Sequence, residues 1–161
     1  MIRVPDEFLR SVVTFELPAQ GAYAIGIAFV PKDFRELNRL DQIAHEEGLE
    51  ILGWREVPVD SSSLGATALS VMPDFKMLVI AAKNGETGIQ LDRLAFCFRK
   101  RVEHQLPIYF ASLSAQTLVY KGMLTTHQLS EFFPDLNDQR LKSPFRVGSL
   151  SLSTNTFPSW R

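Results

Sequence analysis

The stretch AYAIGIAFV, residues 22–30, decides the fold, because it is the first segment of the chain with a clear alternating pattern. Its large side chains, Tyr23, Ile25, Ile27 and Phe29, alternate with alanine and glycine. Such alternation is typical of a β-strand whose two faces differ. The small residues on the second face indicate that another part of the molecule packs closely there. The neighbouring elements can be placed outward from this strand.

A helix is predicted directly after this strand. Asp33 suits the N-cap position, and Glu36 follows three residues later, in the capping-box position. Apolar residues then recur with helical spacing as far as Gly48, a residue favoured just past the end of a helix. The pattern therefore predicts a helix between Asp33 and Gly48.

Strands and helices continue to alternate as far as residue 114. The expected elements are a strand at 49–59, a short helix ending near Ser70, an apolar and therefore central strand at 75–82, a helix at 89–105 and a strand at 108–114. The helix at 89–105 is the clearest, with apolar residues on one face at i, i+3, i+4, i+7 and i+11. Residues 21–114 thus follow the β-α-β-β-α-β order of a ferredoxin-like layer, and the fold class is α+β. A fold alone names no function.

The two ends of the chain add shorter elements. A short helix is predicted to begin at Pro5 or Asp6. In residues 115–161 we expect a hairpin that joins 108–114 to 117–122, a short helix capped by Thr125 or Thr126, a loop at 134–143 and a final strand at 145–156.

Composition excludes several classes of protein. The 161 residues are 45% hydrophobic and 22% charged with a net charge of −1, so no electrostatic field favours nucleic acid. No apolar run approaches the ~18 residues of a membrane span, and residues 1–10 lack the apolar region of a secretory signal. The single cysteine excludes an internal disulfide and fits a reducing compartment. We expect a cytoplasmic protein of about one domain.

The residue types that usually carry chemistry give no site by spacing. His45, His104 and His127 are far apart and lack metal-ligand spacing, so each is expected on an exposed helix face or helix end. Cys97 falls in the middle of the helix at 89–105, where we expect a buried and inert thiol. The prediction is therefore no catalytic residue and no metal ligand in this chain.

The polar end of the chain, SLSLSTNTFPSWR, is the exception. Ser153, Thr154, Asn155 and Thr156 group hydroxyls with an amide that both donates and accepts. Such a group suits a small zwitterion, whose carboxylate needs donors and whose amine needs acceptors. The alternative is a capped turn before Pro158.

Four segments, in this order, resemble the N-terminal glutaminase (class II amidotransferase) domain of the large subunit of glutamate synthase. They are EGLEILGWREVPVD at 47–60, LVYKGML at 118–124, FFPDLND at 132–138 and STNTFPSW at 153–160. The stretches LPAQGAYAIGIAFVPKD and FRKRVEH are also similar to that family, so the resemblance covers the whole chain. It implies an N-terminal-nucleophile hydrolase (αββα) fold that acts on L-glutamine.

In that family a cysteine at the mature N-terminus attacks the glutamine side-chain amide, and its own α-amine is the general base. An Asn-Gly pair donates to the oxyanion. Ammonia then passes to a synthase domain that uses FMN and an iron–sulfur cluster. The resemblance implies that these cofactors bind elsewhere in the parent enzyme and that this chain itself holds none.

This chain departs from the family pattern at three points. It begins at Met1, without the N-terminal cysteine segment, and it stops before the Asn-Gly pair. Ser151 stands where the family places the arginine that clamps the glutamine α-carboxylate. Thr154 matches the family threonine that contacts the same ligand, and Asn155 is its neighbour. Residues 1–161 are therefore expected to be a partial amidotransferase domain with three substrate-binding residues and no activity alone.

Two other hypotheses stay open at this stage. The β-α-β-β-α-β part could be a non-catalytic module that binds a small amino acid or dimerises through its sheet edge. The chain could also act in trans with the rest of a glutamate synthase chain, or with a complementing chain that carries the cysteine.

Overall fold

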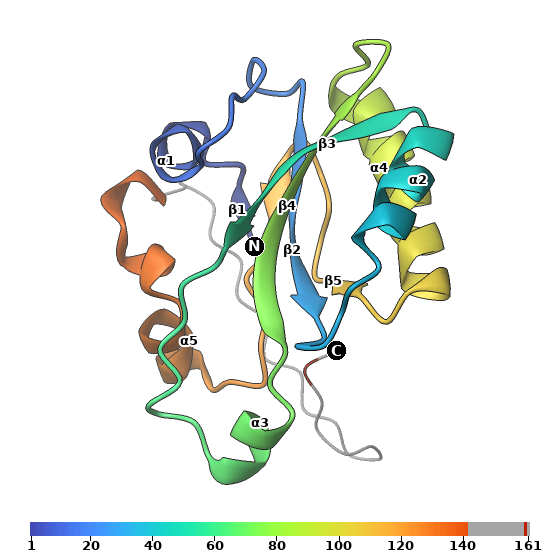
Figure 1. Ribbon diagram of the computed structural model, residues 1–161. Helices are drawn as coiled ribbons and strands as arrows, with labels where there is room; N and C mark the ends of the chain where they lie inside the picture. The colour runs from blue at the N-terminus through green and yellow to red at the C-terminus, as the bar shows by residue number, and fades with distance from the viewer. Residues whose placement is uncertain (142–159, 161) are drawn as a thin grey trace.

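The computed structural model describes residues 1–141 and Trp160. An antiparallel sheet forms the middle of the molecule, and Figure 1 shows two helices, α2 and α4, side by side on one of its faces. The shorter elements, α1, β1 and α5, lie on the opposite side. The layers are therefore helices, sheet, and a mixed layer of short strands and helices.

The central sheet contains four strands in the order β3-β4-β2-β5, and every neighbouring pair is antiparallel. Its strands are β2 (Ala24–Val30), β3 (Leu49–Glu56), β4 (Asp74–Ala82) and β5 (Tyr109–Phe110). Every residue of β2 is buried, because helices cover one face of the sheet and the mixed layer covers the other. A bulge between Ile51 and Gly53 shifts the register of β3 against β4.

The helical face of the sheet is covered by α2 (Leu37–Glu46) and α4 (Gly88–Gln105). Helix α4 buries Leu91, Ala95, Phe98 and Val102 against the small side chains of β2. Arg101 of α4 forms ion pairs with Glu46 and Glu47 at the end of α2. The two helices are thus joined to the sheet by apolar packing and to each other by charge.

The opposite face carries the mixed layer. Its elements are β1 (Ile2–Arg3), α1 (Asp6–Val12), α3 (Ala66–Ser70), β6 (Thr117–Leu118), α5 (Thr126–Phe132) and the 3₁₀ turns η1 (Pro134–Asn137) and η2 (Gln139–Leu141). Strands β1 and β6 pair antiparallel and form a second, two-stranded sheet. A large apolar cluster lies between this layer and the central sheet.

Most of the predicted elements are confirmed, with their ends shifted by a few residues. Gly48 ends α2 with a φ of 73°, the left-handed conformation that favours glycine. Thr125 caps α5 in a complete capping box with Gln128. The small residues of β2 are also explained, because a Cβ on Gly26 would lie 1.9 Å from the carbonyl oxygen of Ser112. The chain beside β5 therefore approaches β2 as closely as a glycine allows.

The predicted hairpin between 108–114 and 117–122 is wrong. Strand β5 pairs with β2, whereas β6 pairs with β1 in the other sheet. The hydroxyl of Ser112 accepts a hydrogen bond from the backbone N–H of Val119, and Ser114 Oγ accepts from the N–H groups of Gln116 and Thr117. These side chains occupy donors that a hairpin ladder would need, and the chain crosses from one sheet to the other.

Two local predictions are also corrected. Asp33 is not the N-cap of α2, since a turn closed by the N–H of Phe34 on the carbonyl of Pro31 delays the helix to Leu37. Cys97 is exposed rather than buried, because it precedes Phe98 and the helix rotates by about 100° per residue. The predicted strand at 145–156 lies outside the described residues.

In the part of the chain that the structure describes, no helix combines the length and apolar character needed to cross a membrane. The three histidines, at positions 45, 104 and 127, are exposed as predicted.

The close approach at Gly26 gives a direct test. Gly26→Ala should lower the free energy of unfolding by about 1–3 kcal/mol or more, because the new methyl group overlaps a backbone oxygen that cannot move alone. Gly65→Ala is the matched control: a Cβ there meets nothing within 4 Å, so its effect should stay below about 1 kcal/mol. Urea denaturation of both variants measures the difference. Equal effects would contradict the close contact.

Candidate functional site

The predicted substrate-binding residues Ser151, Thr154 and Asn155 lie outside the described residues. The structure therefore does not place them, and they stay a prediction. The last part of the same stretch is described, however, because Trp160 has a defined position. The described neighbours of the predicted site are the residues that contact Trp160 and the other segments that resemble the amidotransferase family.

Trp160 is inserted into the apolar cluster on the mixed face of the sheet. Only 4% of its surface is exposed. Its indole Nε1 donates a hydrogen bond to the carbonyl oxygen of Ala68 in α3, at 3.1 Å. The rings of Phe75 and Phe132 lie 5.4 and 5.7 Å from it between centroids. The end of the polar stretch is thus anchored to β4, α3 and α5 by packing and by one hydrogen bond.

Gly122 shows why a glycine stands in the LVYKGML segment. A Cβ at this position would lie 2.9 Å from the Trp160 ring and 2.8 Å from the Leu124 side chain. Both distances are shorter than carbon atoms tolerate, so a larger residue would displace the tryptophan. The LVYKGML segment and the end of STNTFPSW are therefore in direct contact.

A buried ion pair joins two other segments of the resemblance. Arg55 of β3 donates from both terminal nitrogens to the Asp135 carboxylate of η1, at 2.7 and 2.8 Å. The two side chains are only 13% and 5% exposed. A bidentate, charge-assisted pair of this kind fixes both the distance and the orientation of its partners. The pair connects the WRE sequence near the end of β3 with the FFPDL turn, and its two residues are 80 positions apart in the chain.

Tyr120, from the LVYKGML segment, completes this group. Its hydroxyl donates to the same Asp135 carboxylate at 3.1 Å. Burial, together with the nearby negative charge of Asp135, raises the pKa of the Tyr120 phenol well above its usual range. The hydroxyl therefore stays protonated and remains a donor. Asp135 accepts three hydrogen bonds, which satisfies a carboxylate that has almost no access to water.

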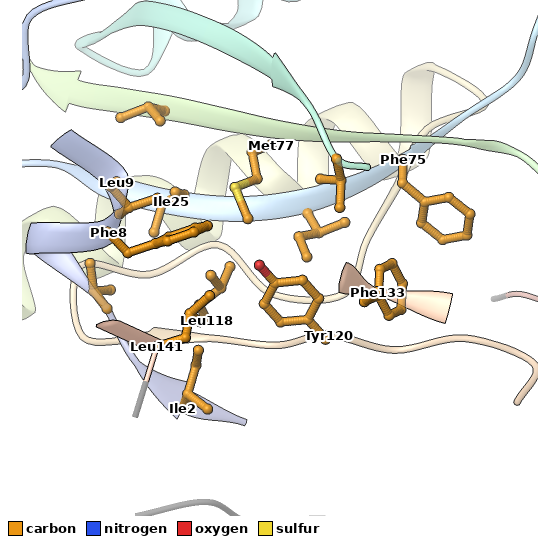
Figure 2. Packing of buried hydrophobic residues seen from close by; sticks show 14 of the residues in the cluster. Ile2, Phe8, Leu9, Ile25, Phe75, Met77, Leu118, Tyr120, Phe133 and Leu141 are labelled. Carbon is orange, nitrogen blue, oxygen red and sulfur yellow. The ribbon is translucent and has the colours of Figure 1, made fainter. Parts of the chain in front are cut away.

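The surroundings of this group are apolar and aromatic. Figure 2 shows Tyr120 and Phe133 on one side of the cluster and Phe8, Ile25 and Met77 close by. Two guanidinium groups contact the Phe8 ring, that of Arg55 at 5.4 Å and that of Arg140 at 5.8 Å from its centroid. Helix α1 is thereby included in the same unit through cation–π contacts.

Two further bonds join the loop after β3 to α5. The N–H of Asp60 donates to the carbonyl of Phe132 at 2.9 Å. The Gln128 side chain donates to the carbonyl of Ser63 at 2.8 Å. The EGLEILGWREVPVD and FFPDLND segments thus meet at more than one point.

The group formed by Arg55, Tyr120 and Asp135 can fix the positions of the segments that carry it. None of these three side chains is available as a nucleophile or as a proton carrier. The charge of Arg55 is neutralised by Asp135, and the Tyr120 phenol is locked as a donor. No group of three or more histidine, cysteine, aspartate or glutamate residues within 1–141 could bind a metal ion. Cys97 lies on the exposed side of α4. This helix covers the face of the sheet opposite the Arg55–Asp135 pair.

Sequence reasoning missed Arg55, Tyr120 and Asp135 as a group. Spacing could not reveal them, because they come from three segments far apart in the chain. The available signal was the resemblance itself, since each of the three residues lies inside one of the segments that carry it. The structure shows that these segments meet in space.

Comparison with known proteins identifies the family. A family model described as glutamine amidotransferases class-II matches residues 1–161. The chain belongs to the class-II glutamine amidotransferase family. Membership implies an N-terminal-nucleophile hydrolase fold, and the mixed α+β architecture with antiparallel sheets is what the structure shows of it.

Individual relatives of this class-II chain are glutamate synthases. It is 33% identical over 99% of its length to the "Glutamate synthase [NADPH] large chain" of Bacillus subtilis. It is 37% identical over 84% of its length to the "Ferredoxin-dependent glutamate synthase 2, chloroplastic" of Arabidopsis thaliana, and 39% identical over 89% to the "Glutamate synthase [NADH]" of Schizosaccharomyces pombe. The matches cover 11%, 9% and 8% of those proteins, so the chain spans about a tenth of their length.

The buried pair can be tested by removing one charge. Asp135→Asn should cost about 3–5 kcal/mol in the free energy of unfolding, because it leaves the Arg55 cation buried without a counter-charge. Glu56→Gln is the control, since Glu56 also forms a 2.7 Å ion pair, with Lys76, but is 73% exposed. That change should cost about 0–1 kcal/mol. Chemical denaturation measures both, and a loss for Asp135→Asn no larger than the control's would show that the pair contributes little.

Proposed function

We propose that this chain supplies part of the glutaminase domain of a glutamate synthase, which hydrolyses L-glutamine to glutamate and ammonia for glutamate biosynthesis. The observation that carries the proposal is the match to the class-II family over residues 1–161. The relatives named above support the narrower assignment, because each is called a glutamate synthase.

The fold assigned to this function has two parts. Residues 21–114 form a β-α-β-β-α-β segment of ferredoxin-like type, supported by the strand order β3-β4-β2-β5 and by α2 and α4 on one face. The small β1–β6 sheet on the other face belongs to the second sheet of an αββα sandwich.

Thr154, Asn155 and Ser151 are proposed to form one wall of the glutamine site. Support comes from the sequence match at Thr154 and from the anchoring of Trp160, which ends the same stretch. Ser151 offers one neutral donor where the family has an arginine, and a neutral hydrogen bond to a carboxylate is weaker than a bidentate, charge-assisted one. Glutamine is therefore expected to bind weakly.

A polypeptide of these residues is proposed to be inactive by itself. The single cysteine, Cys97, lies inside α4, so it has no free α-amine beside it to act as base. Activity then requires a chain-terminal cysteine from the rest of a glutamate synthase chain or from a complementing chain. FMN and the iron–sulfur cluster would likewise belong to other parts of the enzyme, and a cytoplasmic location stays part of the proposal.

An ammonia-release assay tests the catalytic part of this account. The purified 161-residue polypeptide should release no ammonia from L-glutamine above background. Turnover that persists in Cys97→Ala would contradict the account, because no thiol would then be present in the polypeptide.

Calorimetric titration with L-glutamine tests the binding part. Ser151→Arg should tighten binding by about tenfold or more, since an arginine–carboxylate pair contributes about 1.5–3 kcal/mol. Ser153→Arg, which adds the same charge two residues away, is the matched control and should not tighten it. Equal affinities in the two variants would refute the assignment of position 151.

A further inference from the structure

A hollow of about 210 Å³ opens on the helical face of the sheet, where β2 leads into the loop before α2. Its walls include Lys32, Phe34 and Arg35 of that loop, Trp54 of β3 and Lys76 of β4. Trp160 and the family segments around it lie on the opposite face. The hollow and Trp160 therefore lie on opposite faces of the central sheet.

Three cationic side chains among the described residues line the hollow, and only one of the three forms an ion pair within the described part of the chain. Lys76 forms an ion pair with Glu56 at 2.7 Å. No carboxylate among the described residues forms an ion pair with Lys32 or Arg35. Arg35 donates from one nitrogen to the carbonyl of Phe34, and within residues 1–141 no other hydrogen bond of its guanidinium group is found. Two cations at one hollow favour a ligand with negative charge.

Acidic groups near the hollow set a limit on this field. Asp74 is part of the wall, and Glu56 accompanies Lys76. Asp33 and Glu36 alternate with the two cations along the loop but do not line the hollow. Among the described side chains that line the hollow, three are cationic and one, Asp74, is acidic. An anionic group is therefore favoured by direct contact with Lys32 and Arg35 and not by the summed charge of the surroundings.

The rest of the wall is apolar and partly aromatic. Phe34 and Trp54 are half-buried and pack against the cluster beneath α2 and α4. Leu37 keeps 53% of its surface exposed at the rim. Flat apolar surfaces beside flexible cationic side chains recognise molecules that combine an anionic group with a flat apolar body. A volume of about 210 Å³ is smaller than the ~300–1,000 Å³ sites of drug-sized ligands.

We propose that this hollow is a second ligand site, which binds a small organic anion with a flat apolar body. Lys32 and Arg35 hold the carboxylate or phosphate group, and Trp54 and Phe34 contact the apolar body. Lys76, which is paired with Glu56, also lines the site. Carboxylate and phosphate groups share this chemistry, because both accept the forked donors of arginine.

Nuclear magnetic resonance of the ¹⁵N-labelled chain tests the proposal, since the chain has two tryptophans that lie on opposite faces of the sheet. The probes are phenyl phosphate, benzoate, neutral benzamide and inorganic phosphate. Phenyl phosphate, benzoate or both should move the Trp54 indole signal to saturation and leave the Trp160 signal in place. The effective anion distinguishes a phosphate site from a carboxylate site. Trp54→Phe assigns the two signals.

The cation contribution is tested by a pair of double variants. Removing both loop cations, Lys32→Ala with Arg35→Ala, should weaken binding about tenfold or more, because it removes charged hydrogen-bond donors. Lys83→Ala with Arg93→Ala removes the same charge from exposed positions outside the hollow and should leave affinity unchanged. The proposal is overturned if neither anion saturates, if benzamide or inorganic phosphate binds as tightly, or if the two double variants behave alike.

Discussion

The Arg55–Asp135 ion pair is the contact on which the mixed layer of the protein depends. Two charges removed from water are costly unless every donor and acceptor is matched. Here the match is supplied by the bidentate geometry, by the Tyr120 hydroxyl and by the Phe8 ring stacked against Arg55. The pair thus imposes one arrangement on β3, η1 and the LVYKGML segment, whereas apolar packing alone would tolerate several.

The residues of this group come from segments that resemble class-II amidotransferases. WRE, LVYKGML and FFPDL contribute Arg55, Tyr120 and Asp135, and the end of STNTFPSW contributes Trp160 against Gly122 and Phe132. None of these residues can act as a nucleophile here. Their contacts fix the position of Trp160 against the mixed face of the central sheet.

Local signals in the sequence predicted most of the elements. The alternation around Ile25 and Ile27 identified β2, and the helical spacing of Leu91 and Phe98 identified α4. The hairpin prediction failed because the hydroxyls of Ser112 and Ser114 accept hydrogen bonds from backbone N–H groups that a hairpin would use. An alternating sequence pattern does not reveal such side-chain bonds. The Arg55–Asp135 pair joins residues 80 positions apart, and no periodicity reports such a distance. Cys97 was predicted to be buried because it lies between two phenylalanines in the sequence. It is exposed because adjacent residues of a helix point in directions about 100° apart.

The most direct measurement of the central claim is native-state hydrogen exchange on the unmodified chain and on Asp135→Asn. If the ion pair holds the mixed layer to the sheet, the amides of Phe133 and Leu136 should lose protection at least about tenfold more than the amides of β2 and β4, because the layer would open as a unit before the sheet does. A loss of protection that is equal in both parts, or absent from the mixed layer, would contradict the account.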